Sequence, residues 1–191
     1  MQEAGLASLA YFYFDFRDIA KQTTRGLLSS LIIQLSARSD LCSDILSALY
    51  LKHDQGLQQP SDDVLLECLK EMFSLSGQGP TYIVVDALDE SPNNTGTPSP
   101  RERLLNLFAT FVGLDNPHLH LCITSRPEPD IRNVLRPLST FGVSIHDEIG
   151  QMHDIVDYIN SVVASDPKMR KWTPADKQVV VDVLTQRADG M

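Results

Sequence analysis

The sequence predicts an α/β fold in which a mainly parallel sheet is flanked by helices. Short segments of strand-forming residues alternate along the chain with longer segments whose apolar residues recur at helical spacing. Residues 82–85 are apolar without a break, which is typical of a strand covered on both faces. The 191 residues, 42% of them hydrophobic, correspond to about one domain, or to one domain and a small extension.

The N-terminal half is expected to form two strands separated by three helices. The first strand contains the β-forming run Tyr-Phe-Tyr-Phe, and leucine and isoleucine residues recur at helical spacing in the segments after it. Ser61 stands where an N-cap is expected, and glycines 77 and 79 with Pro80 end the third helix. The expected elements are a strand within 6–16, helices over 19–39, 41–52 and 62–75, and a strand over 81–86.

The C-terminal half continues the alternation and then becomes helical. Residues 91–100 are a loop by their proline, glycine and asparagine content, and Ser99, Pro100 and Glu102 have the pattern of a capping box. The expected elements are a helix over 101–113, a strand over 118–124, a short helix over 130–135, a strand over 143–146, a helix over 152–163 and a helix that opens at 173–176. We therefore expect a core over residues 1–150 and the start of a helical extension over 151–191.

Composition excludes several classes of partner. The net charge of −9 and the pI of about 4.9 argue against a nucleic-acid backbone and against a polybasic membrane contact. No apolar stretch reaches the roughly 18–20 residues of a membrane span, and the N-terminus lacks the layout of a signal peptide. Three widely spaced cysteines with no CxxC pattern favour a reduced, cytoplasmic protein.

Three carboxylates follow the strand over 81–86. Asp86 is placed at the mouth of the sheet, where a carboxylate holds Mg²⁺ directly or through water. Asp89 and Glu90 lie one tight turn later, close enough to orient or deprotonate a water molecule. The alternative is that all three acids cap a solvated loop. Four apolar residues followed by Asp, a small residue, an apolar residue, Asp and Glu favour an NTPase.

The next strand ends in Thr124, Ser125 and Arg126, beside the acids. Arg126 is suited to contact a γ-phosphate or to report its loss. It is equally suited to pair with Asp89 or Glu90 and to neutralise it, and both hypotheses stay open.

Other candidate sites are weak. His118 and His120 face one side of a strand, as two metal ligands would, but no third ligand is evident. Cys122 lies among apolar strand residues and is expected in the core. The basic run over 168–172 is expected to be a solvated loop.

At this point the chain resembles a known family. TYIVVDALDE (81–90) resembles the Walker B box of NACHT-type NTPases, which belong to the signal-transducing P-loop ATPases. LCITSRPEPDI (121–131) resembles their sensor 1 strand, and LASLAYFYFDFRDIAKQT (6–23) their unit after the P-loop helix. The likeness is to fungal NACHT proteins with a nephrocystin-like N-terminal domain, and HDEIGQMHDIVDYI (146–159) and the terminal RADGM fit it too.

The resemblance implies roles for the candidate residues. Asp86 would be the Mg²⁺-associated acid, and Arg126 would be the sensor. Asp89 and Glu90 would be the catalytic acids, with Glu90 the water activator. The cofactor would be ATP or GTP with Mg²⁺, and the intact protein would be a signalling switch.

One departure limits this inference. A P-loop needs the pattern G-x-x-x-x-G-K followed by Ser or Thr, and these 191 residues contain none. The resemblance places the missing strand between the sensor 1 strand and the strand over 143–146, which would lose its neighbour. We expect a truncated NACHT core that does not bind nucleotide tightly alone. The alternative is a non-catalytic interaction module that forms homo-oligomers or docks to full-length relatives.

Overall fold

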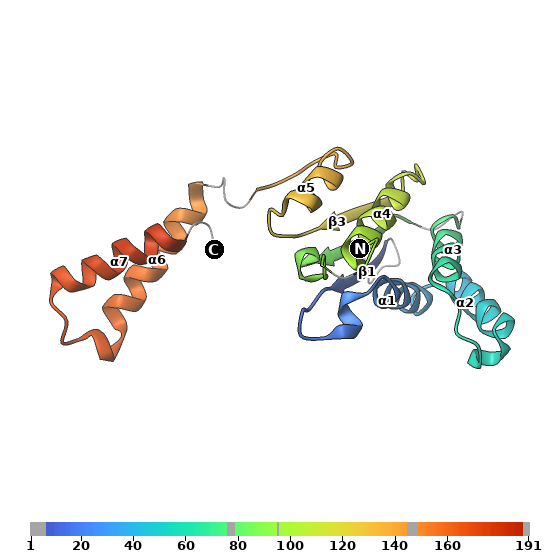
Figure 1. The fold of residues 1–191 in the computed structure, drawn as a ribbon, viewed down its shortest axis with the longest axis horizontal. Coiled ribbons are helices and arrows are strands. Elements are labelled where there is room, and N and C mark those ends of the chain that lie inside the picture. The colour runs from blue at the N-terminus through green and yellow to red at the C-terminus, as the bar shows by residue number, and fades with distance from the viewer. Residues whose placement is uncertain (1–6, 76–78, 95, 145–148, 189–191) are drawn as a thin grey trace. The chain divides into compact units, whose positions relative to one another are not determined.

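The computed structural model describes residues 7–75, 79–94, 96–144 and 149–188. The chain divides into two compact units, residues 1–139 and residues 140–191 (Figure 1). The first unit contains, in order, β1 (Ser8–Tyr13), η1 (Ile19–Gln22), α1 (Thr24–Ser36), α2 (Asp40–Lys52), η2 (Asp54–Gly56), α3 (Asp62–Phe73), β2 (Thr81–Asp86), η3 (Leu88–Glu90), α4 (Pro100–Val112), β3 (Leu119–Ile123) and α5 (Pro129–Leu135).

The three strands form a parallel sheet in the order β1-β2-β3. Ala10 lies opposite Ile83 in the register, and Ile83 lies opposite Leu121. The predictions of an α/β fold and of strands near 6–16, 81–86 and 118–124 are therefore confirmed. Both helix starts predicted from a serine cap are also confirmed, because Ser61 Oγ accepts a hydrogen bond from Val64 N and Ser99 Oγ accepts one from Glu102 N.

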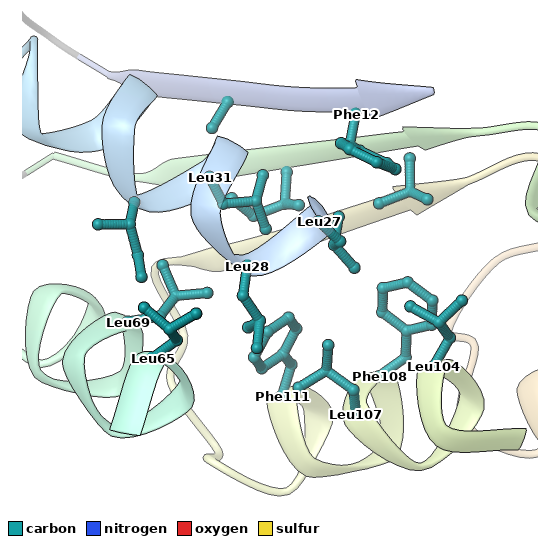
Figure 2. Packing of buried hydrophobic residues seen from close by; sticks show 14 of the residues in the cluster. Phe12, Leu27, Leu28, Leu31, Leu65, Leu69, Leu104, Leu107, Phe108 and Phe111 are labelled. Atoms are coloured by element: carbon teal, nitrogen blue, oxygen red, sulfur yellow. The ribbon is translucent and has the colours of Figure 1, made fainter. Parts of the chain in front are cut away.

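The hydrophobic core lies between one face of the sheet and three helices. Phe12, Ile83 and Val85 point to this face and are buried. Figure 2 shows the leucines of α1 directed toward the aromatic rings of α4 and the leucines of α3. The connections from β1 to β2 and from β2 to β3 both move in the same direction along the sheet. Because crossovers between parallel strands are right-handed, the helices of both connections lie on the same face.

The opposite face of the sheet is open in the described part of the chain, so the expectation of cover on both faces is wrong there. Tyr11 is 53% exposed and Tyr82 is 40% exposed. Tyr82 stacks on His120, with ring centroids 4.8 Å apart. Cys122 also lies on this face and is exposed, which corrects its expected place in the core. An unbroken apolar run does not reveal that one of its two sides has no helix beside it.

The two other cysteines, Cys42 on α2 and Cys68 on α3, are buried. Burial raises the pKa of the Cys68 thiol to about 11, with a smaller contribution from Glu71. Cys68 therefore stays protonated at neutral pH.

The single helix expected over 19–39 is two elements. Thr23 is extended between η1 and α1, and its Oγ1 accepts a hydrogen bond from Gly26 N, so a new helix begins there. Gly26 also passes close to η1. A Cβ atom at this position would lie 2.1 Å from the carbonyl oxygen of Ala20, a backbone atom that cannot rotate away.

Replacing Gly26 by alanine is expected to lower the free energy of unfolding by about 1–3 kcal/mol, because the overlap forces the backbone apart. Alanine in an open helical position would instead stabilise by up to about 1 kcal/mol. Urea unfolding followed by circular dichroism measures the change. Gly142→Ala is the control, since no atom lies within 4 Å of its Cβ position, and it should change stability by less than about 0.5 kcal/mol. Equal effects at both positions would contradict the close approach.

The strand expected over 143–146 is not confirmed where the structure describes it. Residues 143 and 144 have no regular secondary structure, and residues 145 and 146 lie outside the described residues.

The second unit is helical, as expected from its sequence. It contains α6 (Ile149–Ser165), η5 (Pro167–Met169) and α7 (Pro174–Ala188). Its small core consists of Ile159, Val163 and Val181. Across the described residues, none of the helices has both the length and the apolar content that crossing a membrane requires.

Candidate functional site

The candidate site lies where β2 and β3 end, at the same edge of the parallel sheet. Asp86 is the last residue of β2 and is exposed, and Thr124 directly follows β3. The hydroxyl of Thr124 donates to Oδ1 of Asp86 and accepts a 3.1 Å hydrogen bond from Ala87 N. The threonine predicted at the strand end therefore orients the carboxylate that was predicted to accompany Mg²⁺.

A sharp turn at Ala87 separates Asp86 from the other two acids, Asp89 and Glu90. Ala87 has left-handed backbone angles, φ 55° and ψ 46°, and the short η3 helix follows it. The turn is fixed because Leu88 N donates to Thr124 O at 3.0 Å and the Leu88 side chain is fully buried. We call residues 86–91 the acidic loop.

Asp89 pairs with Arg126. Oδ1 of Asp89 accepts a hydrogen bond from Arg126 N at 2.9 Å, and Oδ2 lies 3.4 Å from Arg126 Nε. The Asp89 side chain is 11% exposed, whereas that of Arg126 is 79% exposed. Pairing with Asp89 was one of the two roles that the sequence left open for Arg126. Most of the guanidinium nevertheless faces solvent.

Glu90 joins the acidic loop to the segment that follows β1. Its Oε2 accepts a hydrogen bond from Phe16 N at 3.0 Å. Both predicted catalytic acids thus hold backbone N–H groups of neighbouring segments. Among the described contacts Asp86 differs from them, since its carboxylate accepts a side-chain hydroxyl and faces solvent.

Arg101 is a part of this site that sequence reasoning missed. It lies in the first turn of α4, is buried, and hydrogen-bonds through its guanidinium to the carbonyl oxygens of Asp89 and Ser91. Its Nη1 lies 3.3 Å from Oδ2 of Asp130, in the first turn of α5. One signal was available: a cation in the first turn of a helix is disfavoured by the helix dipole and needs a partner.

The arrangement fits Mg²⁺ only in part. Mg²⁺ is bound through one or two carboxylates together with phosphate oxygens and water, and Asp86 with Thr124 supplies oxygen atoms of that kind. No group of three or more His, Cys, Asp and Glu side chains that would hold a metal unaided occurs in the described residues, including around His118 and His120. Phosphates need successive backbone N–H groups from a glycine-rich loop, which this sequence does not contain.

Comparison with known proteins identifies a family that the chain matches. The family model described as "Nephrocystin 3, N-terminal" matches residues 1–126 of the 191 residues. The matched range includes the acidic loop and ends at Arg126. No curated protein and no solved structure matches the chain.

Proposed function

Because the chain belongs to the nephrocystin 3 N-terminal family, we propose that it is part of a NACHT-type, nucleotide-dependent signalling switch. The observation that supports this function best is the Asp86–Thr124 pair at the open end of a parallel sheet. Ligands of open α/β sheets bind outside the carboxyl ends of the strands, which is where this pair lies.

In this proposal Asp86 is the residue that holds Mg²⁺, and Thr124 fixes its orientation. When bound, Mg²⁺ would neutralise charge on the phosphates of ATP or GTP. Asp86 can take this role without losing a backbone hydrogen bond, because none of its described side-chain contacts is to an N–H group.

Arg126 is the proposed sensor. Its backbone N–H is anchored on Asp89, while its guanidinium is held by one long contact at 3.4 Å and is otherwise exposed. Because this contact is long and the Arg126 side chain is largely exposed, an anionic group nearby can compete for the guanidinium. Glu90, the proposed water activator, is anchored through Oε2 alone in the described contacts.

The phosphate-binding loop of the proposed switch has to come from outside these 191 residues. We therefore expect the 191-residue chain and the native protein that contains it to differ in nucleotide binding. The 191-residue chain should show no change in melting temperature with Mg·ATP or Mg·GTP. The native protein that contains it should bind one of these nucleotides in the presence of Mg²⁺ and lose the binding in EDTA. A native protein that binds neither nucleotide would overturn the proposal.

A second candidate function, a non-catalytic interaction module, is favoured by the edges of the sheet. At the β1 edge, the Gln34 side chain accepts a hydrogen bond from Tyr11 N and donates one to Tyr11 O. These backbone groups are therefore not available to pair with another strand. At the β3 edge, the N–H groups of Leu121 and Ile123 point away from β2 and have no partner in the described part of the chain. An unpaired edge is a template for another strand.

Sedimentation of the 191-residue chain tests this second function. It predicts a concentration-dependent dimer, or co-purification with a full-length relative, that is lost in Cys122→Lys. Lysine at an edge strand discourages pairing, and the Cys122 side chain is exposed, so the fold should tolerate the change. A monomer with no such partner would contradict the module.

A further inference from the structure

We propose that Arg101 is the positioning residue of the acidic loop and that its pair with Asp130 links this loop to α5. The inference rests on the proposed function in treating the acidic loop as a functional site. The positioning role itself does not depend on nucleotide binding, because it is argued only from contacts within the chain.

Arg101 contacts the acidic loop through two atoms of its guanidinium, and its backbone contacts the residue that follows the loop. Nε and Nη2 donate to Ser91 O at 3.1 and 2.9 Å, and Nη2 also donates to Asp89 O. Its backbone N donates to Pro92 O at 3.1 Å. A planar guanidinium reaches two carbonyl oxygens and a carboxylate at once, which a lysine ammonium on a flexible stem does not do with the same geometry.

The outer side of the same guanidinium faces the start of α5. Nη1 contacts Asp130, and Oδ2 of Asp130 also accepts a 3.0 Å hydrogen bond from Nδ2 of Asn93. Ser99, the N-cap of α4, donates to Oδ1 of Asn93. The acidic loop, the start of α4 and the start of α5 are thus held by one polar network with Arg101 inside it.

The position of Arg101 disfavours a positive charge, and its polar contacts offset this free-energy cost. Its side chain is only 10% exposed and lies at the positive end of the α4 dipole, two conditions that disfavour a cation. A residue that only supported α4 would be better neutral or acidic here. The carbonyl oxygens of Asp89 and Ser91 and the Asp130 carboxylate account for the arginine.

Arg101 affects the rest of the candidate site through its contact with Asp89. Arg101 holds the carbonyl of Asp89, and the carboxylate of the same residue holds the backbone N–H of Arg126. Removing the guanidinium frees the backbone of the acidic loop, so the Asp89–Arg126 contact and the Glu90–Phe16 contact lose their fixed geometry. Arg101 itself need not touch any ligand for this effect.

Amide hydrogen exchange by NMR in Arg101→Met tests the inference. The amides of Arg126 and Phe16 should exchange about tenfold faster or more than in the unchanged chain, because each donates to a carboxylate that the loop positions. The amide of Val85, in the buried β2 strand, reports global unfolding and should change less. Arg103→Met is the matched control, since Arg103 is exposed on the same helix and should leave all three amides unchanged.

Two milder variants keep the test decisive if Arg101→Met does not fold. Arg101→Lys retains the charge but loses the planar fork, and should still accelerate exchange at Arg126 more than at Val85. Asp130→Asn removes the charge that pairs with Arg101 and should raise exchange at the amide of Arg132, which donates to Glu128 O at the start of α5. Equal acceleration at Val85 and Arg126, or no change at Arg126, would overturn the positioning role. Because no nucleotide is present, this outcome is independent of whether the proposed switch binds ATP or GTP.

Discussion

Replacing Phe108 by alanine is expected to lower the free energy of unfolding by about 3–5 kcal/mol. Phe108 is fully buried on α4 and makes an edge-to-face contact with Phe111, with ring centroids 6.3 Å apart. Figure 2 shows it beside Leu104 and Leu107, facing the leucines of α1. Removing the ring leaves a cavity in the centre of the only layer that covers the described sheet.

Val112→Ala on the same helix is the control for Phe108→Ala. Val112 is 42% exposed, so its truncation should change stability by less than about 0.5 kcal/mol. Urea unfolding of both variants, followed by circular dichroism, measures the difference. A loss below about 1 kcal/mol for Phe108→Ala would mean that α4 does not pack on the sheet as described.

Replacing Asp86 by asparagine in the native protein is expected to weaken binding of the Mg²⁺-nucleotide about tenfold to a hundredfold. The amide keeps the shape of the carboxylate and can still accept from Thr124, but it loses the charge that attracts a divalent cation. Titration of a fluorescent ATP or GTP analogue gives the affinity. In EDTA the two proteins should bind equally poorly, since the effect operates through the metal.

Asp63→Asn makes the same change of charge at an exposed position on α3 and should leave the nucleotide affinity unaltered. If Asp86→Asn binds Mg²⁺-nucleotide as tightly as the unchanged protein, the role proposed for Asp86 is wrong, even if the protein binds nucleotide.

The parallel sheet was predictable because its signal is local. Apolar segments at 81–86 and 118–124 are each preceded by an amphipathic helix, and such an alternation leads to parallel strands. The contact of Asp86 with Thr124 and the contact of Asp89 with Arg126 followed from the same argument, because parallel strands end at one edge. The order of helix and strand was therefore enough to place the ends of the two strands side by side.

The features that were not predictable depend on what lies beside an element. The apolar run of β2 has the same appearance whether one or two faces are covered, and here Tyr82 is partly exposed. The break at Thr23 depends on a threonine that can stand inside a helix or begin one. Arg101 acts on carbonyl oxygens that become neighbours only when the loop turns back onto α4.

We propose that the acidic loop is one part of a nucleotide site whose phosphate-binding loop lies outside these residues. The measurement to make is the intact mass of the native protein from cells, together with the masses of its peptides. We expect a mass well above 21.2 kDa and a peptide N-terminal to Gln2 that contains a P-loop. A mass that matches these 191 residues would contradict it and would make the interaction module the leading function.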